Sequence, residues 1–310
     1  MITYIDGDLF RSPAQVLVNT VNVVGVMGKG VAKEFKRLYP EMFRQYRQLC
    51  DQHKFTIGQL FLYKTPHKWV LNFPTKKDWR NPSRPEYIEE GLKKLVSIYA
   101  YVGIHSIAMP LLGCGNGELD WQNTVRPLVE RYLAKLPIQV FVHTLSTLPP
   151  LVPEHRDVKK IEEWLRSEPE HLPFAEVWHD LARVLSDRSS FKTLAERSHF
   201  RATVTHDPEG IRLVANERVE FVRRSELVDF WQQLRVYGFT SRQIAPTGLT
   251  RRYSYLMPIF AELPYVKPVR IADSYEQLRV GAQTIGLQYM PRQREATPAP
   301  GSLFEQSIPI

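Results

Sequence analysis

The stretch Asn19-Thr20-Val21-Asn22, followed closely by Gly25-Val26-Met27-Gly28-Lys29-Gly30, decides the fold expected for the first half of this chain. The apolar run from Ala14 to Val18 leads into it and is typical of a buried strand. The glycines allow the backbone to approach a ligand closely, and the helix N-terminus that follows favours anions. This order of strand, asparagines, glycine loop and helix predicts a site for a phosphate and a sugar.

A second glycine loop, Gly113-Cys114-Gly115-Asn116-Gly117, follows the apolar run from Ser106 to Leu112. That run does not alternate with polar residues, which is typical of a central strand covered on both faces. One glycine loop alone is commonly a tight turn, and neither loop has the spacing of a Walker loop or of the dinucleotide fingerprint. Two such loops after neighbouring strands favour a binding site, because ligands of α/β sheets bind beyond the carboxyl ends of the strands.

Strands and helices alternate through the first half of the chain. Strands are expected at residues 2–6, 14–20, 58–63, 69–73, 106–112 and 138–142, and helices at 29–50, from 85 to 103 and after Asp120. The alternation predicts a three-layer α/β/α domain with a mixed, mostly parallel sheet over residues 1–150.

Prolines at 149, 150 and 153 mark a linker, after which the pattern changes. Helices are expected at 156–167, 173–187 and 225–236, and strands at 200–205, 211–215 and 220–223, whereas 246–273 is ambiguous. We therefore expect a smaller α+β domain over residues 155–290 and an extended, Pro-rich tail over 291–310.

The composition is that of a soluble globular protein, with 43% hydrophobic and 24% charged residues in 310. The apolar runs are too short for a membrane helix, and the N-terminal residues do not resemble a signal peptide. Only Cys50 and Cys114 are present, so we expect no disulfide framework, a cytoplasmic location and no membrane partner. The nine histidines lack metal-ligand spacing, so neither a metal nor a cofactor is expected.

The positive charge is concentrated in the first half. Residues 1–150 carry 19 Lys+Arg against 12 Asp+Glu, whereas residues 151–310 carry 22 against 21. The excess suits a protein that meets phosphates, although a generic basic surface explains it equally well. The second half has 18 Arg and 4 Lys, which fits a DNA-binding domain, but its balancing acids favour a protein–protein surface.

Three polar side chains near the loops each have two interpretations. Asp8 either caps a turn or accepts hydrogen bonds from an adenine amino group. Asn22 either shapes a turn or bonds ribose hydroxyls. Cys114 is either a nucleophile or, as its small neighbours favour, a compact residue of the loop.

A basic segment follows the strand expected at 69–73 and contains Lys76, Lys77, Trp79, Arg80 and Arg84. Basic residues after a strand are commonly solvated. Cations interleaved with an aromatic ring also suit single-stranded nucleic acid, because phosphates bind the charges and a base stacks on the indole. Lys77, Trp79, Arg80 and Arg84 are therefore candidate DNA contacts.

The first 145 residues or so resemble the macrodomains, a family of ADP-ribose-binding α/β/α domains. The resemblance runs in order through Gly7-Asp8, the strand end Asn19–Asn22 and both glycine loops. With Asn72-Phe73-Pro74-Thr75-Lys76 included, it is strongest to the DarG branch. Proteins of that branch are the antitoxins of DarT/DarG systems, and their macrodomain removes ADP-ribose that the toxin attaches to bases of single-stranded DNA.

The resemblance implies a role for each matching segment. Asp8 would hold the adenine, Asn22 and the segment 28–30 the distal ribose, and the loop 113–117 the diphosphate. Lys76 matches the lysine that this branch places at the scissile ribose carbon, so it is the expected catalytic residue. The residues expected at ADP-ribose are Asp8, Leu9, Asn19, Asn22, Gly28, Lys29, Gly30, Val31, Thr75, Gly113, Cys114, Gly115, Asn116 and Gly117.

The chemical role of Lys76 is open between two alternatives. As an ammonium it supports developing charge on the leaving base or on the ribose oxygen. As a neutral amine it attacks the anomeric carbon or assists a water, which requires a pKa lowered by burial or by cations such as Lys77 and Arg80.

An oxocarbenium-like transition state usually calls for a carboxylate. Some relatives place a catalytic Asp at the position that is Gly117 here, so the carboxylate is missing from its usual place. Participation of Glu118 or Asp120 is open, although Asp120 has the position of a helix N-cap.

The resemblance therefore implies an antitoxin that hydrolyses ADP-ribose from bases of single-stranded DNA and releases ADP-ribose. Its C-terminal domain would bind and inhibit a cognate DarT-like toxin. The alternative is a non-catalytic reader of ADP-ribose marks fused to a DNA- or protein-binding domain. The modified base, the stoichiometry of a toxin complex and the contacts between the halves are not predicted.

Overall fold

The computed structural model describes residues 1–144, 153–167, 172–196, 198–242, 244–246, 248–271 and 284–290. The expected tail at 291–310 and the prolines at 149 and 150 lie outside the described residues.

The first half contains a six-stranded sheet in the order β1-β6-β5-β2-β4-β3. All neighbours are parallel except the edge pair β3 and β4, which is antiparallel. The strands are β1 (Ile2–Ile5), β2 (Val16–Asn22), β3 (Phe61–Lys64), β4 (Trp69–Lys76), β5 (Ser106–Pro110) and β6 (Gln139–His143). The prediction of a mixed, mostly parallel sheet is confirmed.

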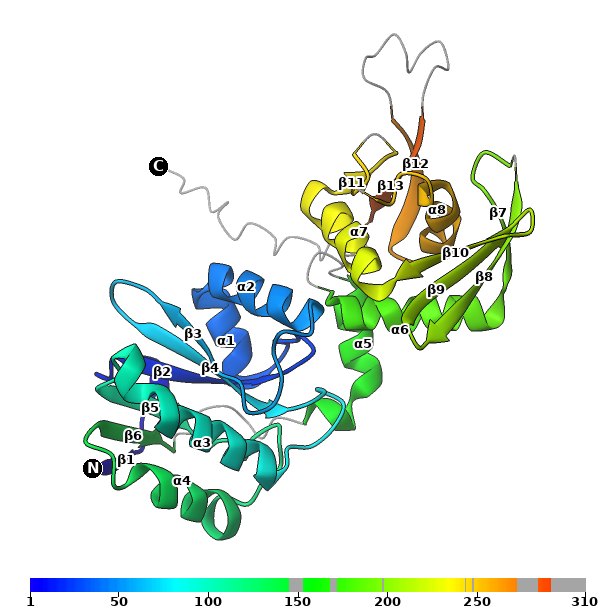
Figure 1. The fold of residues 1–310 in the computed structure, drawn as a ribbon. Helices are drawn as coiled ribbons and strands as arrows, with labels where there is room; N and C mark the ends of the chain where they lie inside the picture. The colour runs from blue at the N-terminus through cyan, green and yellow to red at the C-terminus, as the bar shows by residue number, and fades with distance from the viewer. Residues whose placement is uncertain are drawn as a thin grey trace, which may run out of the picture.

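Helices cover both faces of this sheet (Figure 1). The helices are α1 (Gly30–Leu38), α2 (Pro40–Asp51), α3 (Pro85–Val102) and α4 (Arg126–Leu133). Successive residues of β2 point to opposite faces, so Leu17 packs in the cluster of α1 and α2 and Val18 in the cluster of α3 and α4. The three-layer α/β/α architecture predicted from the sequence is confirmed.

The prediction of a single helix over residues 29–50 is wrong, because the chain forms the two helices α1 and α2 there. Pro40 begins α2, and the residue before it, Tyr39, leaves the helical region with φ −130° and ψ 66°. Proline disfavours helical geometry in the preceding residue, so the helix ends there even though the apolar periodicity continues.

The second half contains two antiparallel sheets and four helices in its described residues. The helices are α5 (Val158–Ser167), α6 (Phe174–Asp187), α7 (Arg224–Tyr237) and α8 (Tyr253–Ala261). One sheet has the order β10-β9-β8-β7 and the other β11-β13-β12. Their strands are β7 (Ser190–Lys192), β8 (His199–His206), β9 (Glu209–Ala215), β10 (Arg218–Arg223), β11 (Phe239–Thr240), β12 (Val266–Ile271) and β13 (Thr284–Tyr289). The helices and strands expected up to residue 236 are confirmed within a few residues, and the ambiguous segment contains α8 and β12.

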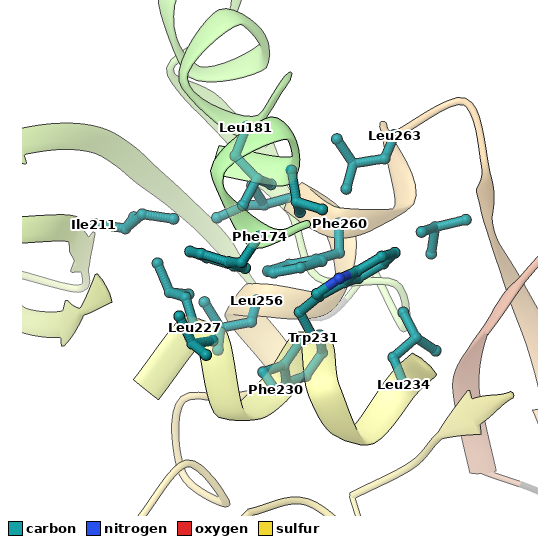
Figure 2. Close-up of a cluster of buried hydrophobic side chains, with 14 of the residues drawn as sticks. Phe174, Leu181, Ile211, Leu227, Phe230, Trp231, Leu234, Leu256, Phe260 and Leu263 are labelled. Atoms are coloured by element: carbon teal, nitrogen blue, oxygen red, sulfur yellow. The ribbon is translucent and has the colours of Figure 1, made fainter. Parts of the chain in front are cut away.

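The core of the second half is aromatic and lies between α6, α7 and α8. Figure 2 shows Phe174, Trp231 and Phe260 gathered in it. The same buried cluster includes Val26 and Trp79 from the first half, so the two halves share a core.

Asp51 at the end of α2 adds polar contacts between the halves. Its carboxylate accepts a hydrogen bond from the Phe174 backbone N–H at 2.8 Å and lies 3.5 Å from the Arg235 guanidinium. Among the described residues no helix is long and apolar enough to cross a membrane.

Candidate active site

The first glycine loop is shaped by Asn22 at the end of β2. The Asn22 amide donates to the Val26 carbonyl at 2.7 Å, and its side-chain oxygen accepts from the Val24 and Val26 backbone N–H groups at 3.1 Å each. Tyr46 on α2 holds the same residue from behind, because its hydroxyl donates to the Asn22 carbonyl at 2.6 Å. Asn22 therefore acts as a turn-forming residue here, and one of its two amide hydrogens remains for a ligand.

Asn19 lies deeper in β2 and ties that strand to its neighbour. Its amide donates to the side-chain oxygen of Asn72 on β4 at 2.9 Å. Asn19 is fully buried, so this hydrogen bond holds β2 against β4 just before the first glycine loop. Asn72 is a site residue that sequence reasoning did not single out, although it stands in the motif that precedes Lys76.

The two glycine loops lie side by side, as the adjacency of β2 and β5 requires. Gly30 begins α1 with φ +58°, and a Cβ on it would lie 3.0 Å from the Asn116 amide nitrogen. Lys29 and Val31 flank Gly30 and are partly exposed, whereas Leu9 and Thr75 are buried behind the site.

The second loop is too tightly packed to carry a side chain at Gly117. A Cβ there would lie 2.2 Å from the Ser83 hydroxyl and 2.3 Å from the Gly113 carbonyl oxygen. Gly113 itself has φ +69°, which favours glycine. Gly115, in contrast, faces open space, because a Cβ on it would meet no atom within 4 Å.

Cys114 is a compact loop residue rather than a nucleophile. Its thiol donates to the Leu112 carbonyl oxygen at 3.3 Å. Burial raises the pKa of the Cys114 thiol to about 12, and Asp120 adds to the shift. A thiol that stays protonated at neutral pH is a poor nucleophile.

Asp8 lies at the carboxyl end of β1, in an open hollow of about 560 Å³ that it lines with Gly7, Arg11 and His143, among others. One Asp8 oxygen accepts from the Phe10 backbone N–H at 3.0 Å, so Asp8 does cap a turn. The other oxygen is 3.9 Å from the Arg11 guanidinium in this exposed setting. The buried His143 at the end of β6 was missed by sequence reasoning; its Nδ1 lies 2.9 Å from the Gly7 carbonyl oxygen.

Lys76 ends β4 and is paired in register with Asn22 of β2. The residue is only 4% exposed, and its Nζ has no hydrogen-bond partner among the described residues. Burial lowers the pKa of the Lys76 ammonium, while the charges of Glu154, Glu118 and Asp78 act in the opposite direction. The lowered pKa is thus due to burial and not to neighbouring cations such as Lys77 or Arg80.

The prediction that Trp79 contacts DNA is wrong. Trp79 is 0% exposed, packs in the core of the second half and donates its indole N–H to the Glu176 carboxylate at 3.0 Å. An indole in that position has no free face on which a base can stack.

The prediction that Arg80 contacts DNA is also wrong, since its guanidinium is taken by carboxylates of α5 and α6. It donates to both oxygens of Glu176 at 2.5 and 2.6 Å and to Glu162 at 2.7 Å. Lys77 and Arg84 remain exposed, with the Lys77 ammonium 5.7 Å from the Tyr87 ring centroid. A DNA contact by these two exposed residues stays a prediction.

The start of the second half covers the site. Trp164 of α5 packs on Gly28, where a Cβ would lie 2.9 Å from its ring. The 3₁₀ helix Glu154–Arg156 faces the second loop, with His155 Nε2 at 2.6 Å from the Glu118 carboxylate and Arg156 in an ion pair with it. Glu154 lies within this helix and was missed, because no local motif connects it to Lys76.

Asp120 caps the turn Trp121–Val125 as expected, accepting from the Asn123 backbone N–H at 3.0 Å. Among the described residues no group of three or more His, Cys, Asp or Glu could hold a metal ion. The arrangement offers an open hollow for a ring system at the end of β1, glycine loops for phosphates after β5 and β2, and a buried amine at the end of β4.

Comparisons with known proteins find matches to the first half of the chain. The Macro domain family model matches residues 18–128. The DNA ADP-ribosyl glycohydrolase of Mycobacterium tuberculosis is 49% identical over 136 residues, which cover 43% of this chain and 39% of that protein. The DNA ADP-ribosyl transferase–DNA ADP-ribosyl glycohydrolase fusion protein of Thermosipho africanus is 36% identical over 169 residues, covering 48% of this chain and 43% of that protein.

These matches thus span about two fifths of the curated relatives' length. The solved macrodomain of Thermus aquaticus DarG is 44% identical, with a TM-score of 0.44, and the match covers 46% of this chain and 97% of that one. Through the segment that the family model matches, the chain belongs to the macrodomain family.

Proposed function

We propose that this protein is an antitoxin that hydrolyses ADP-ribose from ADP-ribosylated bases of single-stranded DNA. The observation that carries the proposal is Lys76, whose buried amine stands at the end of β4 beside Asn22 and has no hydrogen-bond partner in the described part of the chain. A buried amine without a partner costs stability. Its presence here therefore indicates a role with a ligand or in a reaction. The curated relatives named as DNA ADP-ribosyl glycohydrolases support the same assignment.

Each part of ADP-ribose has a complementary region in this site. The adenine fits the open hollow beside Asp8 and His143, where a carboxylate oxygen and an imidazole are available. The diphosphate fits the backbone N–H groups of the loop 113–117, and the distal ribose fits the remaining Asn22 amide hydrogen and the segment 28–30. This order brings the anomeric carbon of the distal ribose toward Lys76.

The partners follow from the same proposal. A single strand carrying the modified base meets exposed Lys77 and Arg84 at the rim. The Thermosipho africanus relative joins a DNA ADP-ribosyl transferase and a glycohydrolase in one chain, which supports a DarT-like transferase as the partner of this protein. We assign its inhibition to the region 155–290, place the macrodomain at 1–150, and infer a cytoplasmic location, where such a pair meets DNA.

The test measures release of free ADP-ribose from single-stranded oligonucleotides that carry ADP-ribose on each base type in turn. Lys76→Ala is expected to lower kcat by roughly 10²–10³-fold, because it removes a cationic group that can stabilise charge at the reaction centre. Lys77→Ala, next to it and exposed, is the matched control and is expected to keep kcat. A wild-type protein that binds ADP-ribose without releasing product is a reader, and Lys76→Ala with full turnover removes Lys76 from catalysis.

A further inference from the structure

Hydrolysis of a glycosidic bond through an oxocarbenium-like transition state usually needs a carboxylate, and the second glycine loop cannot supply one here. Gly117 has no space for a side chain. The Glu118 carboxylate is held by His155 and Arg156. Asp120 is held by the backbone and side chain of Asn123. Positions 117, 118 and 120, which lie in or next to the second loop, are therefore excluded as sources of the catalytic carboxylate.

Glu154 is a buried carboxylate in the 3₁₀ helix that contacts Glu118 next to the second loop, although it lies beyond the linker in the sequence. It is 6% exposed, and the positive charges that act on it are Lys76 first and Lys29 second. The segment is held in place, since the two residues after Glu154 are anchored on Glu118 and its own carbonyl accepts from the Asp157 N–H at 3.1 Å. A buried acid and a buried amine whose charges act on each other are typical of a functional site.

We propose that Glu154 is a catalytic residue that acts as the general base of the hydrolysis. The inference rests on the proposed glycohydrolase function and deepens it: the active site is completed by the first turn of the C-terminal region. Lys76 and Glu154 form the acid–base pair, with the amine contributed by β4 and the carboxylate by the 3₁₀ helix Glu154–Arg156.

The proposed step balances without any group beyond water. Glu154 takes a proton from a water whose oxygen forms the new bond to the anomeric carbon. The bond between that carbon and the base nitrogen breaks, and its electron pair stays on the nitrogen. The Lys76 ammonium gives that nitrogen a proton, and the proton on Glu154 returns to the amine. The products are ADP-ribose and the restored base.

The electrostatics suit these roles. Burial raises the pKa of the Glu154 carboxyl to about 7, against the attraction of Lys76 and Lys29, with Asp78 raising it further. Burial also lowers the pKa of Lys76, which makes its ammonium a better proton donor. An acid and a base whose pKa values move toward the working pH are matched for proton transfer. Two further titratable groups act on this pair. Glu118 acts on Lys76 and raises its pKa, and Tyr46 interacts with Glu154 but stays neutral because burial holds the pKa of its phenol high.

The test compares Glu154→Gln with Asp157→Asn, an acid-to-amide change three residues further along the same segment. Turnover of ADP-ribosylated oligonucleotides and the Kd for ADP-ribose are measured on the full chain. Glu154→Gln is expected to lower kcat by about 10²–10⁴-fold while the Kd for ADP-ribose changes less than about threefold. Asp157→Asn is expected to match the wild type in both.

The pH profile separates a base from a structural group. A base must be ionised, so wild-type kcat/KM should fall as pH drops below about 7. Glu154→Gln should lose this acid limb. Glu154→Asp, which keeps the carboxylate, should retain the limb with reduced kcat and serves if the glutamine variant does not fold.

Three results overturn the inference. Glu154→Gln with wild-type kcat means that Glu154 is a bystander. Faster turnover in Glu154→Gln means that the segment obstructs the substrate instead of acting on it. An unchanged acid limb in that variant assigns the base elsewhere. Failure of the proposed function is distinguishable, because then the wild type and Asp157→Asn show no turnover either.

Discussion

Replacing Arg80 with alanine tests whether this residue holds the two halves together or contacts DNA. Its guanidinium makes three charge-assisted hydrogen bonds of 2.5–2.7 Å to Glu176 and Glu162. After Arg80→Ala, the Glu176 side chain, which is 2% exposed, keeps the Trp79 indole as its one donor among the described residues. The variant therefore leaves a nearly unpaired charge at the junction of the halves.

The magnitude follows from the burial of the pair. Removing one partner of a buried ion pair costs about 3–5 kcal/mol. The Arg80 side chain is 20% exposed, so water can partly replace it. We expect a loss of about 2–4 kcal/mol in the free energy of unfolding, since this partial access to water discounts the fully buried value.

The assay is urea unfolding followed by tryptophan fluorescence, together with binding of an unmodified single-stranded oligonucleotide across a salt series. Lys77→Ala is the control, since Lys77 is an exposed cation three residues away. It should leave the unfolding midpoint unchanged and reduce the slope of log K against log salt by about 0.7, the amount for one lost phosphate contact on single strands. Arg80→Ala should lower the midpoint and keep the slope. If Arg80→Ala instead reduces the slope and unfolds like the wild type, the conclusion that Glu176 and Glu162 hold Arg80 away from DNA is refuted.

Three further predictions concern the second glycine loop. Gly117→Ala should lower the free energy of unfolding by about 1–3 kcal/mol, the usual cost of overpacking, and weaken ADP-ribose binding. Gly115→Ala has open space around the new methyl group, so thermal denaturation should separate the two variants; equal midpoints would contradict the packing argument. The Cys114 thiol, whose pKa burial raises to about 12, should resist iodoacetamide at pH 8 far better than free cysteine, as read by mass spectrometry. Cys114→Ala should keep glycohydrolase activity, and a large loss of kcat would restore the nucleophile alternative.

The sequence by itself determined the elements whose cause is local. The glycines at 30 and 113 have positive φ. Glycine is the residue that adopts this backbone geometry readily, so both loops can be recognised from the sequence alone. The unalternating run before the second loop and the apolar run from Ala14 to Val18 were sufficient to predict buried strands, because strands covered on both faces need apolar side chains throughout. The layer order follows from these elements, whereas the pairing of Lys76 with Asn22 is a matter of strand register that the structure shows.

Only the tertiary structure decided what the polar and aromatic residues around Lys76 do. Trp79 and Arg80 look like a nucleic-acid surface in sequence, yet their partner Glu176 is 97 and 96 residues away. Glu154 has no local signal, because its burial depends on the packing of the helix Glu154–Arg156, which contacts Glu118 in the first half of the chain. The physical reason is that the burial and pairing of a charge depend on which distant segment packs against it. A local sequence pattern does not identify that segment.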